Sequence, residues 1–216
     1  MTNPQLNIAE LRKDYILATL DMDNTGDDPL VFFHKWFNEA IKAGITEVNA
    51  MTLATVDAAH KPHARIVLLK GLDTRGFVFF TNYESKKGNE LNDNDHAAVV
   101  FFWKELERQI RVEGVVEKVT ATESDAYFSS RPKGSRIGAW ASPQSQEITN
   151  RNLLDDNYYK YEQQFGADIP RPAYWGGYRI LPHKIEFWQG RSNRMHDRIL
   201  FTSEHENSWS KSRLAP

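Results

Sequence analysis

The spacing of apolar residues changes along the chain near residue 50. Before that point apolar residues recur at helical spacing, and beyond it they fall in short runs rich in β-branched and aromatic residues. The first forty-odd residues are therefore expected to be helical. Strands are expected over the runs 51–56, 63–70, 77–81, 97–103 and 109–119. The connections between these runs are short and turn-like, which favours antiparallel hairpins over parallel crossovers.

Two helices are expected in the N-terminal region. The first is an amphipathic stretch marked by Leu6, Leu11, Tyr15 and Ile16. The second has clear end signals, because Asp28 can cap it, Pro29 suits its first turn and Gly44 closes it. The apolar face of this second helix is expected to comprise Leu30, Phe33, Trp36, Phe37, Ala40 and Ile41.

The second half of the chain mixes helices with strands. A capping box from Thr120 to Glu123 opens a helix that Pro132 terminates, and another helix is expected over residues 150–165. Late strands are expected over 177–181, 184–189 and 199–203. These elements predict a single domain over residues 1–216, of α+β class and mainly β, built as a small antiparallel barrel with flanking helices.

The composition is that of an ordinary globular chain. Of its 216 residues, 40% are hydrophobic and 26% are charged, and the formal net charge is −2. No overall basic field favours nucleic acid or an anionic membrane, so any anion site must be a local cluster of cations. The lack of cysteine excludes disulfides, thiolate metal sites and a cysteine nucleophile. We expect a cytoplasmic protein, because the sequence has no signal peptide and no apolar run of membrane-spanning length.

Several common motifs are missing from the sequence. It has no glycine-rich dinucleotide fingerprint, no phosphate-binding P-loop and no nucleophile elbow. His60 and His63 form the only close histidine pair, and they lie in an expected turn without a nearby carboxylate, so no metal is expected. The charge run at 105–108 is expected to be a solvated face.

Two cations bracket the apolar strand expected at 63–70. Because side chains alternate along a strand, Arg65 and Lys70 should point to opposite faces and, if both bind ligands, should serve different ligands or different ends of one site. Ser85, followed by Lys86 and Lys87, would open a short helix whose free amides and positive charge suit a phosphate. The competing interpretation is that these lysines and strand ends are simply solvated.

Tyr127, Arg131 and Ser135 are spaced by four residues, at the end of one expected helix and the start of the next. A hydroxyl, a guanidinium and a hydroxyl at a helix start can together bind a phosphate. The alternative is purely local, with Arg131 binding helix carbonyls and Ser135 starting a helix.

The C-terminal region carries the densest set of candidate residues. Trp188 ends an apolar strand, and beyond it Arg194, His196 and Arg198 alternate along one extended segment, so they should face the same way while Asp197 faces away. Tryptophan offers a flat face and arginine a planar fork of donors, which suits a flat, anionic, aromatic molecule. Together these clusters indicate an enzyme that binds phosphorylated ring compounds.

A series of motifs, in register along nearly the whole chain, resembles the pyridoxine/pyridoxamine 5′-phosphate oxidase family. The motifs are Arg65-Ile-Val-Leu-Leu-Lys70, Phe80-Thr-Asn82 with Ser85-Lys-Lys87, Leu106-Glu-Arg-Gln109, Tyr127-Phe-x-Ser-Arg-Pro132, Ser135-x-Ile-Gly-Ala-Trp140, Trp175-Gly-Gly177, Glu186-Phe-Trp-Gln-Gly190, Arg194-x-His-Asp-Arg198 and Arg213-Leu-Ala-Pro216. Two positions depart from the family pattern: Lys86 stands where many members have arginine, and Met195 replaces a more common leucine.

The resemblance implies an FMN-binding split β-barrel that forms a homodimer with FMN at the subunit interface. It assigns FMN to Arg65, Ile66, Val67, Leu68, Leu69, Lys70, Phe80, Thr81, Lys86, Lys87, Gln109, Gln144, Ser145, Trp188 and Arg198, with Arg65, Lys86 and Lys87 on the FMN phosphate. It assigns the substrate to Lys70, Tyr127, Arg131, Ser135, Arg194, Met195 and His196, and to a lid segment of Arg12, Lys13, Asp14 and Tyr15. Arg194 and His196 would be catalytic, setting the pyridine ring against the flavin. No metal is implied.

The implied reaction is oxidation of pyridoxine 5′-phosphate or pyridoxamine 5′-phosphate to pyridoxal 5′-phosphate, by hydride transfer to the flavin and reoxidation by O2 to give H2O2. One alternative is another split-barrel flavin oxidoreductase or a flavin reductase, which would have no use for the cluster of Tyr127, Arg131 and Ser135. Another is a non-enzymatic barrel module that binds nucleic acid or a vitamin phosphate, although the net charge argues against nucleic acid.

Overall fold

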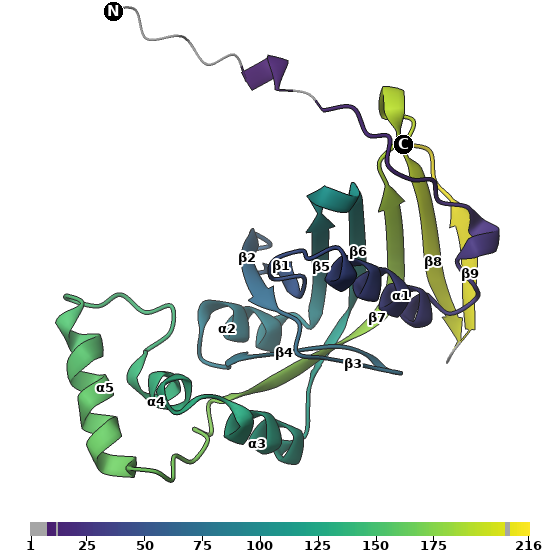
Figure 1. Cartoon of the computed structure of the whole chain (residues 1–216). Helices are drawn as coiled ribbons and strands as arrows, with labels where there is room; N and C mark the ends of the chain where they lie inside the picture. Colours follow the sequence, from purple (N-terminus) through teal and green to yellow (C-terminus); the bar gives the residue numbers. More distant parts are fainter. Residues whose placement is uncertain (1–7, 12, 206–207) are drawn as a thin grey trace, which may run out of the picture. The chain divides into compact units, whose positions relative to one another are not determined.

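The structure, a computed structural model, describes residues 8–11, 13–205 and 208–216 (Figure 1). Within them the chain forms five α-helices: α1 (Pro29–Lys42), α2 (Lys86–Asp93), α3 (Ala121–Ser130), α4 (Lys133–Ala141) and α5 (Asn152–Phe165). The same residues form nine strands: β1 (Ala50–Val56), β2 (Pro62–Leu68), β3 (Gly71–Asp73), β4 (Gly76–Asn82), β5 (His96–Trp103), β6 (Arg108–Lys118), β7 (Trp175–Gln189), β8 (Asp197–His205) and β9 (Ser208–Arg213). Leu6 and Arg12 lie outside the described residues. None of the described helices has the length and apolar character needed to cross a membrane.

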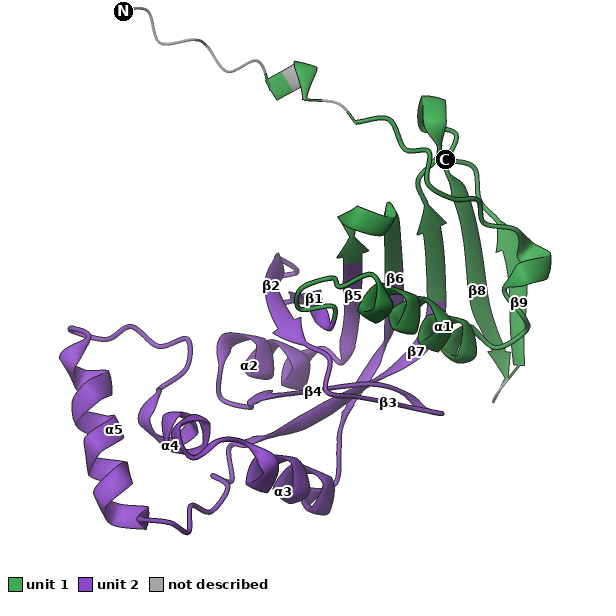
Figure 2. Ribbon diagram, in the orientation of Figure 1, with its two compact units in different colours: residues 1–48, 102–110, 185–216 green, residues 49–101, 111–184 purple. Residues whose placement is uncertain are grey.

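The chain divides into two compact units, each assembled from separate stretches of sequence (Figure 2). Unit 1 comprises the described parts of 1–48, 102–110 and 185–216. Unit 2 comprises residues 49–101 and 111–184. Strands β5, β6 and β7 each contribute residues to both units. A single domain over the whole chain stays a prediction.

Unit 2 is organised around strands in the order β2-β1-β5-β6-β7-β4-β3. β1 and β2 form a hairpin in which Ala50 pairs with Leu68 and Val56 with Pro62. The β1–β5, β3–β4 and β4–β7 pairs are likewise antiparallel, which confirms the predicted antiparallel pairing. Alternate residues of β1 and β5 are buried, as in a sheet with one face in a core: Met51, Leu53, Val99 and Phe101.

Local sequence signals set the helices of unit 2. The Ser85 hydroxyl accepts a hydrogen bond from the Gly88 N–H and so caps α2. Thr120 and Glu123 form a reciprocal capping box at the start of α3. Pro132 then separates α3 from α4, because it follows the last turn of α3 and is itself the first flanking residue of α4. These three features were predicted and are confirmed.

Unit 1 is built on the aromatic face of α1, which is capped by the Asp28 carboxylate. Phe32 and Trp36 pack their rings against Phe187 of β7, at centroid distances of 4.7 and 5.4 Å. Strand β8 pairs with β7 and with β9. Most of the predicted face of α1 is at least partly buried, but Ile41 is 51% exposed and Phe32, which was not predicted, is 4% exposed.

The predicted amphipathic helix through Leu11, Tyr15 and Ile16 is wrong. Only Ile8–Glu10 and Met22–Asn24 form short 3-10 helices in the described part of this region. Leu11 and Ile16 are 71% and 76% exposed, so no packed core stabilises a helix there.

The strands differ from the prediction in three ways. β2 ends at Leu68, two residues before the predicted end. The strands predicted at 177–181 and 184–189 are one continuous strand, β7, which includes Pro182. β9 was not predicted, because its sequence is polar apart from Trp209.

Candidate functional site

Unit 2 contains a cavity of about 480 Å³. Its walls come from β2 and the residues after it, β4, α2, the α3–α4 region and two single positions: Ile66, Val67, Leu68, Lys70, Phe80, Thr81, Lys87, Tyr127, Arg131, Pro132, Ser135, Gln144 and Trp175. All of these except Pro132 and Trp175 belong to the predicted FMN or substrate residues. The fold therefore gathers, from distant parts of the chain, residues that the resemblance had assigned to ligands.

One wall of this cavity is a group of three nearly parallel aromatic rings. The centroids of Phe80 and Tyr127 lie 3.9 Å apart, with 21° between their planes. Trp175 lies 5.6 Å from Phe80 and 6.2 Å from Tyr127, again with its ring nearly parallel to theirs. Such a wall offers apolar area beside the polar groups of the same cavity.

Arg131 lines this cavity with an unsatisfied donor. Its guanidinium carbon lies 4.6 Å from the Trp175 ring centroid. Among the described residues, no group accepts a hydrogen bond from its buried Nη1. Burial lowers the pKa of Arg131, but a guanidinium stays charged at neutral pH. A buried cationic donor without a partner is costly, and an anionic ligand would remove that cost.

The start of α4 adds backbone donors beside Arg131. Its N-cap residue is Pro132, which supplies no side-chain cap, so the first amides of this nine-residue helix are not capped locally. Ser135 lies in the first turn of α4, close to the predicted helix start although the cap itself is Pro132, and it lines the cavity with Lys70. A helix start with two nearby cations is a typical anion site.

Lys87 is held in place by three side chains. Its Nζ donates hydrogen bonds to Thr81, Ser85 and Gln144 at 3.1, 3.2 and 3.0 Å. Burial lowers the pKa of Lys87 to about 8, and the positive charge of Arg65 acts in the same direction. A negative ligand group would favour the charged form of this lysine.

Arg65 and Lys70 lie among different groups of the protein, although β2 ends before Lys70. Arg65 Nη2 lies 3.0 Å from Glu90 Oε2, and Nη1 donates to the Thr55 hydroxyl. Lys70 instead lines the cavity, and its backbone N–H donates to the Val78 carbonyl. The two cations can therefore act on different ligand groups.

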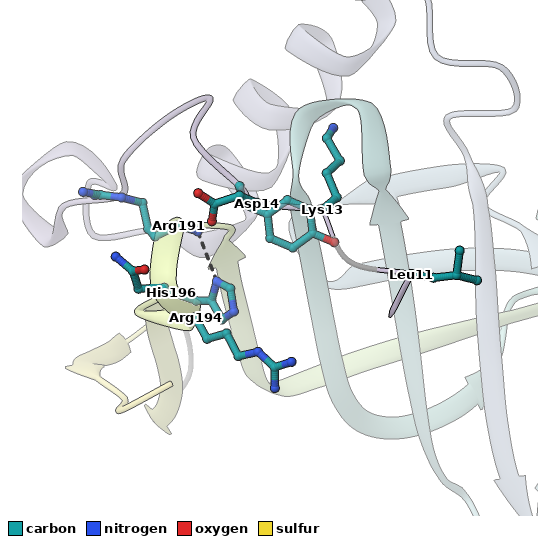
Figure 3. A pocket seen from close by; sticks show the side chains of 8 residues that line it. Leu11, Lys13, Asp14, Arg191, Arg194 and His196 are labelled. Atoms are coloured by element: carbon teal, nitrogen blue, oxygen red, sulfur yellow. Dashed lines mark hydrogen bonds between the residues drawn. The ribbon is translucent and has the colours of Figure 1, made fainter. Parts of the chain in front are cut away.

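Unit 1 contains a second cavity, of about 630 Å³ (Figure 3). The N-terminal segment supplies one part of its wall and the segment between β7 and β8 the other: Leu11, Lys13, Asp14, Tyr15, Arg191, Asn193, Arg194 and His196. The predicted catalytic pair and three residues of the predicted lid thus share one cavity; Arg12, the fourth lid residue, lies outside the described residues.

His196 is held by one backbone hydrogen bond and by ring contacts. The Arg191 N–H donates to His196 Nδ1 at 3.1 Å, as Figure 3 shows, so a neutral ring carries its proton on Nε2. The Trp188 ring lies 4.7 Å from the imidazole, and Tyr15 packs edge-on against Trp188 at 5.7 Å. His196 can therefore donate a hydrogen bond from Nε2 to a ligand.

Arg194 does not lie in an extended segment. It ends a short 3-10 turn (Ser192–Arg194), has a left-handed φ of 61°, and precedes β8, which begins at Asp197. The predicted strict alternation of Arg194, His196 and Arg198 is therefore wrong. The Arg194 side chain is exposed and forms no hydrogen bond or ion pair with the rest of the described chain. Left-handed backbone at a non-glycine residue is strained and is often found at functional sites.

Arg198 is already engaged with protein groups. Its Nε and Nη2 donate to the Glu186 carboxylate at 2.8 and 3.1 Å, and Nη1 donates to the Ala215 carbonyl at 2.7 Å. The hydrogen bond to Glu186 raises the pKa of Arg198. Asp197, expected to face away, instead joins three segments by accepting hydrogen bonds from Leu20, Arg191 and Arg213.

Some predicted residues line neither cavity: Arg65, Leu69, Lys86, Gln109, Ser145, Trp188, Met195 and Arg198. Their roles stay predictions. Among the described residues, no group of histidine, aspartate and glutamate side chains could hold a metal ion.

Sequence reasoning missed two buried carboxylates. Glu107, in the run predicted to be solvated, is 1% exposed and accepts a hydrogen bond from the Leu17 N–H at 3.1 Å. Its left-handed φ of 54° has no sequence signature. Glu90 is 4% exposed and pairs with Arg65. The sequence could have indicated Glu90 as a candidate, because it lies one helical turn beyond Lys86.

Comparisons with known proteins agree with the resemblance. Residues 37–165 match the family model described as pyridoxamine 5′-phosphate oxidase, and residues 175–216 match one described as the pyridoxine 5′-phosphate oxidase C-terminal dimerisation region. Pyridoxine/pyridoxamine 5′-phosphate oxidase 1 of Ralstonia nicotianae is 57% identical over 210 residues, which cover 97% of this chain and 99% of that protein. The pyridoxine/pyridoxamine 5′-phosphate oxidase of a Polaromonas species is 56% identical over 216 residues, all of both chains.

A solved structure shares the fold. PhzG from Burkholderia lata, in complex with tetrahydrophenazine-1-carboxylic acid, superposes with a TM-score of 0.88 at 28% identity, over 94% of this chain and 100% of that one. This likeness confirms the predicted fold class, a split antiparallel barrel with flanking helices. Given the two family matches and relatives above half identity over nearly the full length, this chain belongs to the pyridoxine/pyridoxamine 5′-phosphate oxidase family of oxidoreductases.

Proposed function

We propose that this chain is an FMN-dependent oxidase that converts pyridoxine 5′-phosphate or pyridoxamine 5′-phosphate to pyridoxal 5′-phosphate while O2 is reduced to H2O2. The observation that carries the proposal is the unsatisfied Arg131 guanidinium, which lies in an aromatic cavity with Lys70 and the uncapped start of α4. A planar ring that bears a phosphate matches both the apolar and the cationic parts of this cavity. Family membership supports the reaction type.

The residues of unit 2 suit FMN. Lys86 and Lys87 lie in the first turn of α2, and Arg65 is near enough to Lys87 to affect its pKa, so three cations and a helix start are available to a phosphate. Residues 66–68 of β2 line the cavity and can contact a flat ring system. Thr81 and Gln144 add polar side chains there. When bound, FMN supplies the redox chemistry, because it accepts two electrons from the substrate and returns them to O2. We also assign Leu69, Phe80, Gln109, Ser145, Trp188 and Arg198 to FMN, on the resemblance alone.

The substrate phosphate binds to Lys70, Tyr127, Arg131 and Ser135 in this proposal. A phosphate is remote from the carbon that is oxidised, so the energy of binding it serves to position the substrate. Arg131 and Lys70 supply charge, and the start of α4 supplies directed N–H groups.

Arg194 and His196 orient the pyridine ring of the substrate. His196 donates from Nε2, because its Nδ1 already accepts the Arg191 N–H. Arg194 has no protein partner in the described chain, so its guanidinium is free to bind a ligand oxygen. Lys13, Asp14 and Tyr15 cover the substrate from the N-terminal segment, with Tyr15 braced against Trp188.

We further propose a homodimer with FMN at the subunit interface. The match of residues 175–216 to a dimerisation region supports it. Light scattering on the eluting protein should give twice the chain mass, and flavin titration should give one FMN per chain. A monomer that binds a full equivalent of FMN would contradict the interface. A cytoplasmic location stays a prediction from sequence.

One assay tests the function directly. The FMN-loaded protein is mixed with pyridoxamine 5′-phosphate in air, and aldehyde, ammonia and peroxide are followed together. Oxidation of the amine by O2 with one water should give one equivalent of each product. Absence of aldehyde in flavin-saturated protein would overturn the proposal.

The likeness to PhzG favours one alternative, a flavin oxidoreductase of the same fold that acts on a different ring compound. Such an enzyme has no need for the phosphate donors of Arg131, Tyr127 and Ser135. Comparing phosphorylated with non-phosphorylated substrates separates the two functions, because only the proposed oxidase should depend on the phosphate.

A further inference from the structure

The buried carboxylate Glu90 contacts Arg65, and His63 contacts Lys86. Arg65 and Lys86 are cations assigned to the FMN phosphate, whereas the proposed function uses neither Glu90 nor His63. Glu90 of α2 is 4% exposed. Its Oε2 accepts hydrogen bonds from Arg65 Nη2 at 3.0 Å and from the Thr55 hydroxyl at 2.5 Å. Its Oε1 lies 2.7 Å from His63 Nδ1. A single carboxylate therefore joins β1, β2 and α2 and fixes two side chains of β2.

The contacts of His63 define its tautomer. His63 Nδ1 and Glu90 Oε1 lie 2.7 Å apart, at ion-pair distance but without hydrogen-bond geometry, and neither atom has a hydrogen-bond partner among the described residues. A carboxylate oxygen this close to a ring nitrogen calls for a proton on Nδ1, because two acceptors would repel each other. His63 Nε2 lies 3.0 Å from Lys86 Nζ. An ammonium group can only donate, so Nε2 is the acceptor in this contact. The Nε2 edge of His63 thus adjoins a cation assigned to the phosphate.

His63 and Arg65 face the same way, because they are two residues apart on β2. Their side chains are 25% and 20% exposed, so both keep access to solvent. The charged groups around the imidazole are Glu90 and Lys86 from α2, Arg65 from β2, and Asp57 from the turn before β2. The pKa of Asp57 is lowered chiefly by a hydrogen bond from the Lys61 N–H and more weakly by His63. Protonation of His63 would strengthen the positive field that meets a phosphate, which carries a charge of about −1.5 to −2 at neutral pH.

We propose that His63, oriented by Glu90, is a further phosphate-binding residue of the FMN site and that FMN binding places a proton on its Nε2. The inference rests on the proposed function, since it takes FMN as the ligand. When FMN binds, the Lys86 ammonium group donates its hydrogen bonds to the phosphate and no longer donates to His63 Nε2. The imidazole takes a proton from solvent at Nε2 and keeps it, donating a hydrogen bond from this N–H to the phosphate, while Glu90 stabilises the positive ring through Nδ1. No bond other than these N–H bonds is made or broken.

The first test compares FMN with riboflavin, which has the same ring but no phosphate, by flavin fluorescence quenching on the apoprotein. His63→Gln keeps a donor for Glu90 but cannot be protonated. It should raise the Kd for FMN about tenfold through loss of a charge-assisted hydrogen bond, and should leave the Kd for riboflavin unchanged. Glu90→Gln should raise the Kd for FMN by a smaller factor, about threefold, because the amide oxygen still accepts from Arg65. The matched control is His96→Gln, at an exposed histidine of β5, which should change neither value.

The second test measures proton uptake by calorimetry of FMN binding in two buffers of different ionisation enthalpy at one pH. Wild-type protein should take up more protons than His63→Gln, and the contribution of Lys87 is common to both. Riboflavin binding and circular dichroism report whether each variant is folded. If His63→Gln does not fold, the comparison of wild-type with Glu90→Gln protein takes its place.

The outcomes separate the inference from the proposed function. Equal FMN Kd values and equal proton uptake in wild-type and folded variant protein would overturn the role of His63 and leave the FMN site standing. A wild-type protein that binds FMN no better than riboflavin would overturn both.

Discussion

The two cavities differ in how far their polar groups are fixed before any ligand binds. In the unit 2 cavity, Lys87 makes three side-chain hydrogen bonds and the aromatic wall is already stacked. In unit 1, Arg194 is exposed and lies in a left-handed turn, and the Lys13 side chain is 68% exposed. The Lys87 side chain in the unit 2 cavity is held by other protein groups, whereas the Arg194 side chain in the unit 1 cavity would be ordered only by a ligand.

From this difference we infer that the unit 2 cavity contributes mainly to ligand affinity and the unit 1 cavity mainly to the rate of the reaction. Groups that are already fixed lose little freedom when a ligand arrives, so they contribute chiefly to affinity. Groups that a substrate must order contribute when the reacting atoms are aligned. Substitutions in unit 2 should therefore act mainly on Kd or KM, and substitutions in unit 1 mainly on kcat.

Arg194→Ala should have the largest effect and should show the unit 1 pattern. We expect kcat to fall about 100-fold, because misplacement of the reacting ring carries a penalty of that order. Flavin content, read from the visible absorbance, should not change. Unchanged turnover in the flavin-saturated variant would reject the role of Arg194.

Arg131→Ala should show the opposite pattern. Loss of a charged hydrogen bond of about 2 kcal/mol should raise KM for the phosphorylated substrate about 30-fold, with a smaller change in kcat. The apoprotein should not lose stability, because the substitution removes a buried donor that has no partner in the described chain. Lys133→Ala is the control, since among the described residues that exposed lysine forms an ion pair with Glu162 alone. A kcat effect without a KM effect would contradict the division between the cavities.

The pH dependence of FMN affinity should reflect Lys87. Its pKa is lowered to about 8 by burial, so in the free protein Lys87 loses its charge above that pH. FMN binding favours the charged lysine, and the Kd for FMN should rise by up to about tenfold per pH unit above pH 8. The stability of the apoprotein, by contrast, should increase with pH. The unfolded chain binds more protons than the folded one between pH 8 and the usual lysine pKa, so this group adds stability as pH rises through that window. Lys87→Met should abolish both slopes; their persistence would assign them to another group.

Glu107→Gln should have the smallest effect, and it tests how loosely the N-terminal segment is held. The carboxylate accepts the Leu17 N–H and lies 3.4 Å from Lys13 Nζ. We expect the free energy of unfolding to fall by about 1 kcal/mol and proteolysis near residue 13 to accelerate. Unchanged cleavage would show that the N-terminal segment is held by other contacts.

Features set by neighbouring residues could be predicted from sequence. The cap at Ser85 and the capping box at Thr120 depend on residues three positions away, and both are present. The shared location of Tyr127, Arg131 and Ser135 followed from their spacing and from the resemblance.

Features set by distant contacts could not be predicted. Trp175 joins the aromatic wall because β7 pairs with β4, and Glu107 is buried at a position with left-handed backbone. The N-terminal segment has helical apolar spacing but packs too little surface to form a helix. β9 has a polar sequence and is a strand because β8 lies beside it.

The most direct test of the central claim, that the cationic cavity of unit 2 recognises the substrate phosphate, is the ratio of kcat/KM for pyridoxamine 5′-phosphate to that for pyridoxamine in wild-type and Arg131→Ala protein. We expect the wild-type ratio to be about 100 or more, because a site built for a polar group strongly rejects a substrate that lacks it, and we expect most of that preference to be lost in the variant. A folded, flavin-loaded variant that keeps the wild-type ratio would contradict the account.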